Sequence, residues 1–349
     1  MAPTSSSFPI GTRKSKLAMI QAEQFQGLLQ TLHPNLTFPI IGISAQGDIN
    51  QTTPLHQFSS NAAKGLWTEE LEVLLAEKKC RMVVNCLKDL PTTLPDGFKI
   101  AIVGEREDPR DAVVMATHCH AKTLAELPPG SVVGTSSIRR SAQIKRAFPE
   151  LQFADMRGNV GTRLSKLDDP SLGYACLILA AAGLSRLDLL DRVTQYLEGP
   201  VMYQSPGQGA LAIEVLEGDD ETETLLRPLD HFESRMCTWA ERGMMRYLQG
   251  GCSVPIGCET KYEDGLLTLT GIVVSVDGQT AVDATISAPV KTDAEATQLG
   301  EQVAQKMVDG GAKAVLDEIE RTRNRQTDAA LNGPERDNVD QAGLETMAR

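Results

Sequence analysis

The sequence has no run of about 18 uninterrupted apolar residues, which is the length that a membrane-spanning helix needs. Its first residues, MAPTSSSFPIGT, also lack the charged and then apolar pattern of a secretory signal. From these two absences we expect no membrane span and no secretory export, and we predict a cytoplasmic location.

Paired cysteines and common cofactor signatures are missing as well. The seven cysteines are scattered and include no CxxC pair, which argues against a disulfide framework and against a structural zinc site. No Ser-His-Asp arrangement, phosphate-loop signature or dinucleotide fingerprint is present. We therefore expect reduced thiols, no metal and no nucleotide.

Basic residues are fewer than acidic ones, and the net charge at pH 7 is -12. Nucleic acids and anionic membranes both favour basic surfaces, so neither is an expected partner. Residues 134–166 reverse this balance, with seven basic residues against two acidic ones. Such a run is often only a solvated helical face. Here, however, the arginines lie beside predicted strand ends and helix starts.

The chain has 349 residues, of which 41% are hydrophobic, so it should hold two or three domains. Short apolar runs alternate with helical periodicity over about the first two-thirds, which is typical of a mainly parallel sheet wrapped by helices. After about residue 230 we expect a helix over 231–248, strands within 265–276 and 280–288, and a helix over 294–307. This pattern predicts an α/β fold followed by a small α+β domain.

Two segments resemble each other, FPIGTRKSKLAMIQ at 8–21 and SVVGTSSIRRSAQI at 131–144. Each is predicted to be a strand, a tight Gly-Thr turn and a helix start whose free N–H groups point toward any bound anion. The repetition indicates two domains of similar design, although an ordinary strand-to-helix turn is the alternative. The apolar face of the first of these helices is expected to carry Leu17, Ile20, Phe25, Leu28 and Leu29.

Arginines recur in three segments, GTSSIRR, MRGNVGTRLSKL and AGLSRL, each beside a predicted strand end or helix start. The planar guanidinium pairs two-pronged with carboxylates, so arginines from several loops suit a ligand with many carboxylates. A phosphate ligand would fit nearly as well. In open α/β sheets such loops line the crevice beyond the carboxyl ends of the strands.

Two further residues are candidates for chemistry. Asp89, in LKDLPTTLPDG, directly follows an apolar strand, and beside a cationic cleft its carboxylate could stabilise positive charge or pass protons. Turn formation is the alternative role for this residue. Cys252, in GGCSVPIG, lies in a predicted exposed loop, whereas Cys176 lies inside an apolar run and is predicted to be core. An incidental thiol is the alternative for Cys252.

Nine segments together resemble the porphobilinogen deaminase family, in the same order and with similar gaps, over about residues 8–321. They are GTRKSKLA, KGLWTEELE, LKDLPT, EREDPRDAVV, GTSSIRR, RGNVGTRLSKL, ILAAAGLSRL, SPGQGALAIE and GGCSVPIG. The resemblance implies two α/β domains like those of periplasmic binding proteins, joined by hinge crossings, plus a small α+β C-terminal domain. The implied boundaries are 8–104 with 208–226, then 108–203, then 230–322, with a disordered tail over 323–349.

The resemblance also implies an activity and a cofactor. Members condense porphobilinogen stepwise onto a dipyrromethane primer and release the linear tetrapyrrole hydroxymethylbilane, in tetrapyrrole and heme biosynthesis. The primer is linked by a thioether to the position of Cys252, and Asp89 matches the catalytic aspartate. A monomer that binds porphobilinogen is the implied assembly.

The remaining site residues are implied in the same way. Those expected to bind the cofactor are Cys252, Lys88, Cys86, Ser137, Arg139, Arg140, Arg157, Arg163, Gly158 and Gln208, and those expected to bind the substrate are Arg13, Ser15 and Arg186. The chain departs from the family at Asn85-Cys86, where His-Ser is usual, and at Glu69, where lysine is frequent. A thiol is a poorer hydrogen-bond donor than a hydroxyl, and Glu69 would add negative charge near anions.

Two other kinds of protein fit parts of this pattern. A non-catalytic anion-binding module could use an arginine cleft between two lobes, but it would not need Cys252 or Asp89. A transferase with Cys252 as its covalent nucleophile would need a nearby base such as histidine. None of the five histidines lies within the matching segments.

Overall fold

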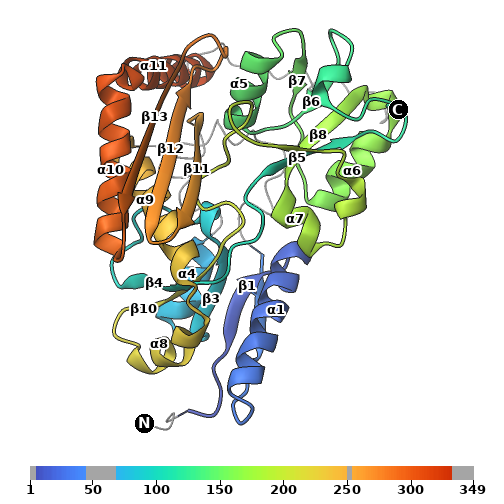
Figure 1. Ribbon diagram of the computed structural model, residues 1–349. Coiled ribbons are helices and arrows are strands. Elements are labelled where there is room, and N and C mark those ends of the chain that lie inside the picture. The colour runs from blue at the N-terminus through green and yellow to red at the C-terminus, as the bar shows by residue number, and fades with distance from the viewer. Residues whose placement is uncertain (1–4, 45–67, 250–253, 332–349) are drawn as a thin grey trace, which may run out of the picture.

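The computed structural model describes residues 5–44, 68–249 and 254–331, with side chains described through residue 322. Within these residues the chain builds two five-stranded sheets and one three-stranded sheet. In Figure 1 the first five-stranded sheet is the lower unit, the second is at the upper right, and the three-stranded sheet is at the upper left.

The first sheet has the strand order β2-β1-β3-β10-β4. Its strands are β1 (Ile10–Arg13), β2 (Ile40–Ile43), β3 (Met82–Cys86), β4 (Phe98–Val103) and β10 (Leu211–Leu216). Strands β2, β1 and β3 are parallel, whereas β10 is antiparallel to both β3 and β4. Four strands therefore point in one direction, which places their carboxyl ends along one edge of the sheet.

The second sheet repeats this design with the order β7-β6-β8-β5-β9. Its strands are β5 (Asp111–Met115), β6 (Val132–Gly134), β7 (Gln152–Ala154), β8 (Tyr174–Ala180) and β9 (Gln195–Leu197). Again one strand, β5, runs against its neighbours. The predicted, mainly parallel α/β organisation is confirmed, although each sheet contains this one reversed strand.

The chain crosses twice between the two sheets. It leaves the first sheet after β4 and enters the second as β5, and it leaves the second after β9 and returns as β10. The reversed strand of each sheet is thus the strand that arrives from the other sheet. Because of this exchange, residues of both crossings lie between the two sheet edges at which most strands have their carboxyl ends.

Helices cover the two large sheets. They are α1 (Lys16–Leu32), α4 (Glu69–Ala76), α5 (Ile138–Ala147), α6 (Val160–Asp168), α7 (Ala181–Arg186) and α8 (Asp220–Leu226). Helix α1 follows β1 and α5 follows β6, and these strands occupy the same place in their sheets. Each helix begins at a serine, Ser15 or Ser137, whose side chain accepts a backbone N–H of the first turn. The repetition predicted from the sequence is confirmed.

The third unit is a small α+β layer. Its elements are α9 (Phe232–Tyr247), β11 (Ile256–Glu263), β12 (Leu266–Val274), β13 (Ala281–Pro289), α10 (Asp293–Asp309) and α11 (Ala312–Leu331). A Cβ atom at Gly300 would collide with the carbonyl oxygen of Ala240, so this glycine lets α10 pack closely on α9. The two predicted strands and two predicted helices of this region are confirmed as β12, β13, α9 and α10, whereas β11 and α11 were not predicted.

Two details differ from the sequence predictions. Leu28 is 53% exposed, and the buried face of α1 carries Gln21 and Ala22 beside Phe25 and Leu29. This face is set by packing on the sheet rather than by apolar spacing alone. Helix α11 continues to Leu331 and so extends into the range 323–349 that was predicted as a tail. Among the described residues, no helix is both long and apolar enough to span a membrane.

Candidate functional site

Asp89 lies directly beyond the carboxyl end of β3, in a short 3-10 helix, η2 (Leu87–Asp89). Strands β1 and β3 are parallel neighbours, so their carboxyl ends meet at the same edge. Arg13, the last residue of β1, places Nη2 at 4.0 Å from Oδ2 of Asp89. The two side chains are 18% and 28% exposed, so this carboxylate is reachable from solvent. Asp89 therefore has the accessibility and the cationic neighbour that its predicted role requires.

Lys88 points toward the second crossing. Its Nζ donates to Oε1 of Gln208 at 3.2 Å. Burial lowers the pKa of Lys88, the negative charge of Asp89 works in the opposite direction, and the positive charge of Arg140 adds to the lowering. Arg140 lies in α5, which follows β6 of the second sheet, whereas Lys88 follows β3 of the first sheet. The structure therefore brings the segments GTSSIRR and LKDLPT within electrostatic range of each other.

Cys86 lies at the end of β3 and contacts Gln21 of α1. Nε2 of Gln21 donates to Sγ of Cys86 at 3.1 Å, and the thiol lies 3.5 Å from Oε1 of the same residue. Burial, followed by the charge of Asp89, raises the pKa of Cys86, so the thiol stays protonated. Sequence reasoning missed Gln21. Its signal was a polar residue at helical spacing between Leu17 and Phe25 on the apolar face of α1.

Arg139 and Arg140 are buried, with 6% and 7% exposure, and both pair with Asp111 at the start of β5. Nη1 of Arg139 lies 2.7 Å from one oxygen of Asp111, and Nη2 of Arg140 lies 2.7 Å from the other. Burial by itself would raise the pKa of Asp111, but the two guanidinium charges outweigh it and hold the pKa well below its usual range. Their expected contacts with ligand carboxylates stay a prediction.

Sequence reasoning also missed the role of Asp111, although it lies within the quoted segment EREDPRDAVV. The available signal was an acidic residue at the head of a fully apolar strand, since a buried carboxylate needs a cationic partner. Nε2 of Gln208 donates to the same carboxylate at 3.1 Å. Gln208 thus connects Lys88 on the first sheet with Asp111 on the second.

Arg157 and Arg163 lie beyond the carboxyl end of β7. Nε of Arg163 donates to the carbonyl oxygen of Gly158 at 2.6 Å, and Gly158 has a φ of 114°, which favours glycine. Burial lowers the pKa of Arg163 to about 10, and the positive charges of Arg140 and Arg157 add to the effect. The charges of Arg140 and Arg157 thus both oppose that of Arg163, and a polyanionic ligand would relieve that repulsion.

Arg186, at the end of α7, donates from Nη2 to the carbonyl oxygen of Gly209 at 2.8 Å. Burial lowers its pKa, and the negative charge of Glu107 works against that effect. The hydroxyl oxygens of Ser15 and Ser137 accept from the N–H groups of Ala18 and Arg140. Each serine retains its O–H as a donor for a ligand at the helix start.

Cys252 lies outside the described residues, between Gln249 and Val254. The structure thus gathers Asp89, Lys88 and Cys86 with arginines of both large sheets, through direct contacts and through the charges that act between them. The attachment of the cofactor to Cys252, and the position of this cysteine relative to that cluster, stay predictions.

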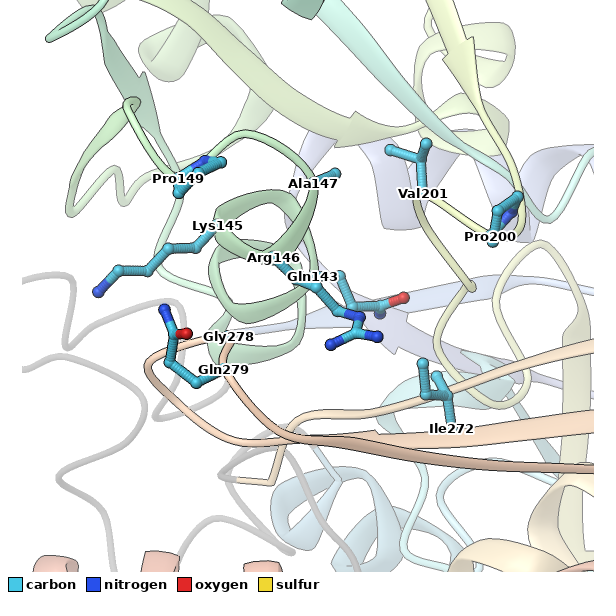
Figure 2. Close-up of a pocket in the computed structure, with 10 residues that line it drawn as sticks. All are labelled: Gln143, Lys145, Arg146, Ala147, Pro149, Pro200, Val201, Ile272, Gly278 and Gln279. Carbon is cyan, nitrogen blue, oxygen red and sulfur yellow. The ribbon is translucent and has the colours of Figure 1, made fainter.

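A cavity of about 530 Å³ lies elsewhere, between α5 and the third unit (Figure 2). It is lined by Gln143, Lys145, Arg146, Ala147, Pro149, Pro200, Val201, Ile272, Gly278 and Gln279. The two cations of this cavity lie in the last turn of α5, where basic side chains complement the negative end of the helix dipole. None of the predicted site residues lines it, and we place the functional site at the Asp89 cluster instead.

Comparison with known proteins agrees with this arrangement of motifs. Residues 8–224 match the family described as porphobilinogen deaminase, dipyromethane cofactor binding domain, and residues 235–309 match the porphobilinogen deaminase C-terminal domain. Porphobilinogen deaminase of Yarrowia lipolytica is 53% identical over 315 residues, which cover 89% of this chain and 92% of that protein. The enzyme of Schizosaccharomyces pombe is 48% identical over 329 residues, covering 93% and 98%.

Among solved structures, the periplasmic aliphatic sulphonate binding protein SsuA of Escherichia coli is similar with a TM-score of 0.39 and 13% identity, covering 88% of each chain. This likeness carries no argument about function. The two family matches together span nearly all of the described chain. The chain therefore belongs to the porphobilinogen deaminase family, which consists of transferases that work on a dipyrromethane cofactor.

Proposed function

We propose that this chain condenses porphobilinogen into hydroxymethylbilane, with Asp89 as the catalytic residue and Cys252 as the cofactor attachment point. The observation that carries the proposal is the position of Asp89 at the end of β3, beside Arg13. The charge of Arg140 reaches the neighbouring Lys88, and it also acts, with that of Arg157, on Arg163. An accessible carboxylate next to fixed cations can stabilise positive charge that develops on a substrate.

Asp89 would accept the pyrrole N–H of porphobilinogen and assist the loss of ammonia. As the carbon–nitrogen bond of the aminomethyl group breaks, ammonia leaves with the bonding electron pair and the ring becomes a cationic azafulvene. The carboxylate of Asp89 stabilises that cation and later accepts the proton lost when the new carbon–carbon bond has formed. When bound, the dipyrromethane supplies the nucleophilic pyrrole carbon for that bond.

The residues present fit such a cofactor because dipyrromethane carries several carboxylates. Arg163 has a lowered pKa that results from burial and from the nearby charges of Arg140 and Arg157. Negative carboxylates would compensate this excess of buried positive charge. Arg13, Ser15 and Arg186 would bind the acetate and propionate groups of the incoming substrate, while Lys88, Cys86, Ser137, Arg139, Gly158 and Gln208 would line the cofactor.

The domain division 8–104 with 208–226, 108–203 and 230–322 belongs to the same proposal. It is supported by the three separate sheets, because each large sheet takes its strands from within the corresponding segments. The monomeric state and the cytoplasmic location also remain predictions, and size-exclusion chromatography with light scattering tests the first.

The experiment compares the wild-type protein with Cys252→Ser and Asp89→Ala, using intact mass and porphobilinogen consumption. We expect the wild type to carry a mass excess equal to two linked pyrroles, Cys252→Ser to lack it, and Asp89→Ala to retain bound pyrrole while losing nearly all turnover. An unmodified wild type after expression with porphobilinogen would favour the anion-binding module. Near-normal rates in Asp89→Ala would remove Asp89 from its role.

A further inference from the structure

Two carboxyl groups that the proposed reaction does not use are buried behind the Asp89 turn. Glu214 of β10 is fully buried and Glu72 of α4 is 8% exposed. Among the described residues, one oxygen of each carboxyl group has no hydrogen-bond partner. Buried carboxyl groups without a full set of partners are costly, so their presence behind the site calls for a physical reason.

Glu214 contacts the strand that carries Asp89. In the β3–β10 pairing Val83 lies opposite Glu214, so Asn85, two residues further along β3, projects from the same face as Val83. Nδ2 of Asn85 donates to Oε2 of Glu214 at 3.2 Å. Asn85 is separated from the Lys88–Asp89 turn by only two residues, so this hydrogen bond fixes the strand just before the turn.

Arg242 of α9 acts on the other side of the same turn. Its guanidinium donates to the carbonyl oxygen of Pro91 at 2.6 Å and approaches that of Leu90 at 3.4 Å. Arg242 is 8% exposed, and the charges of Arg242 and Glu214 influence each other. The segment after Asp89 is therefore held by an arginine that lies within electrostatic range of the same glutamate.

We propose that Glu214 is a positioning residue for Asp89, because it fixes Asn85 before the Lys88–Asp89 turn and lies within electrostatic range of Arg242, which fixes the carbonyl groups after it. The inference rests on the proposed catalytic role of Asp89. Glu214 touches neither substrate nor cofactor, and its effect is to keep the Asp89 carboxylate in one orientation while the substrate carboxylates are bound by other residues. Small displacements of a catalytic group reduce turnover by up to about 100-fold.

The protonation state of Glu214 is part of this proposal. Burial raises the pKa of Glu214 to about 8, the negative charge of Glu72 raises it further, and Arg242 and Asn85 work in the opposite direction. The other titratable group that senses Glu214 is Cys80, which precedes β3 and is itself neutral because burial raises its pKa to about 12. At neutral pH Glu214 therefore keeps its proton and adds no negative charge beside Glu72.

The test compares Glu214→Gln and Glu214→Ala with the control Glu217→Gln, an exposed glutamate just after β10. Glutamine reproduces a protonated carboxyl group, with one acceptor and one donor, so Glu214→Gln should keep kcat within about threefold of the wild type at pH 7. Glu214→Ala should lower kcat by about 10- to 100-fold with little change in KM, because orientation is lost while binding is kept. The control should match the wild type.

A pH profile separates positioning from mere packing. In the wild type kcat should fall as the pH rises through about 8, where Glu214 loses its proton, and this alkaline limb should be absent in Glu214→Gln. Unchanged kcat in Glu214→Ala, or an identical alkaline limb in Glu214→Gln, would overturn the inference. If Glu214→Ala does not fold, the comparison of Glu214→Gln with the wild type still decides. Turnover by Asp89→Ala would instead contradict the proposed function, whatever these variants do.

Discussion

Asp111 shows how much a single residue determines at this site. One buried carboxylate neutralises two arginines of α5 and accepts an amide of the second crossing. The sequence revealed the arginines, because the segment GTSSIRR is distinctive, but not their partner. Asp111 reaches them only because β5 crosses from the other sheet, and that tertiary relation leaves no local pattern in the sequence.

Replacement of Asp111 by asparagine should therefore destabilise the fold strongly. Removal of one partner from a buried ion pair costs about 3–5 kcal/mol, because the remaining charges stay buried without compensation. The matched control is Asp108→Asn in the same crossing, whose pair with Arg110 is 32% to 38% exposed and should contribute no more than about 1 kcal/mol. Urea unfolding at pH 7 measures the free energy of unfolding of both variants, and equal values would contradict the role assigned to Asp111.

The same residue should give the wild type a characteristic acid sensitivity. The pKa of Asp111 is lowered in the folded state, so the stability that it contributes is present above its unfolded pKa of about 4. That contribution is lost as the pH falls from about 4 toward the folded value. In urea unfolding from pH 7 down to pH 3, the wild type should lose its stability advantage over Asp111→Asn only at the acid end. A difference in the free energy of unfolding that stays constant from pH 7 to pH 3 would contradict this prediction.

Cys86 is a second residue whose effect can be tested alone. The thiol lies against Gln21, and a hydroxyl at this position would be a stronger donor in the same place. We expect Cys86→Ser to fold normally and to raise turnover or cofactor retention by a factor of less than about ten. Steady-state kinetics and intact mass measure these effects, and a loss of activity would show that the thiol itself is required.

At the scale of elements, the sequence predicted strands and helices well wherever periodicity was strong. The helices over 231–248 and 294–307 correspond to α9 and α10, whose apolar faces pack into one core with the three-stranded sheet. The prediction for α1 was weaker because Gln21 is buried by its contact with Cys86, while Leu28 extends into solvent. Which side chains of a helix are buried depends on the elements that pack against it, and the periodicity of the sequence does not show this.

The turn before α6 offers an element-scale prediction. Gly158 has a φ of 114° and its carbonyl oxygen accepts from Arg163, so a side chain here would strain the turn and shift that arginine. We expect Gly158→Ala to cost about 1–3 kcal/mol and to raise KM for porphobilinogen. Urea unfolding and kinetics measure the two effects.

Gly161 supplies the control, because it lies inside α6 and an added Cβ would meet only ordinary contact at 3.6 Å. Alanine favours the helix by about 0.5–1 kcal/mol over glycine. Gly161→Ala should therefore leave KM unchanged and should not reduce stability. If the two alanine variants behave alike, the turn at Gly158 has no special role.

At the scale of the whole molecule, the crossings join three units at one junction. Arg106 of the first crossing pairs with the fully buried Glu241 of α9 at 2.7 Å and donates to the backbone oxygen of Gln208 in the second crossing at 2.8 Å. The side chain of Gln208 then contacts Lys88 and Asp111. The sequence indicated the number and kind of domains, but this junction arises from residues more than 90 positions apart and could not be predicted from local patterns.

The central claim is that a chain of pyrroles anchored on Cys252 grows beside Asp89 in a crevice rich in guanidinium groups. Intact-mass spectrometry of the purified protein during reaction with limiting porphobilinogen tests it most directly. The account predicts a ladder of covalent species, each heavier by one pyrrole unit than the last, above a resting protein that already bears two linked pyrroles. Consumption of porphobilinogen with no covalent species on the protein would contradict it.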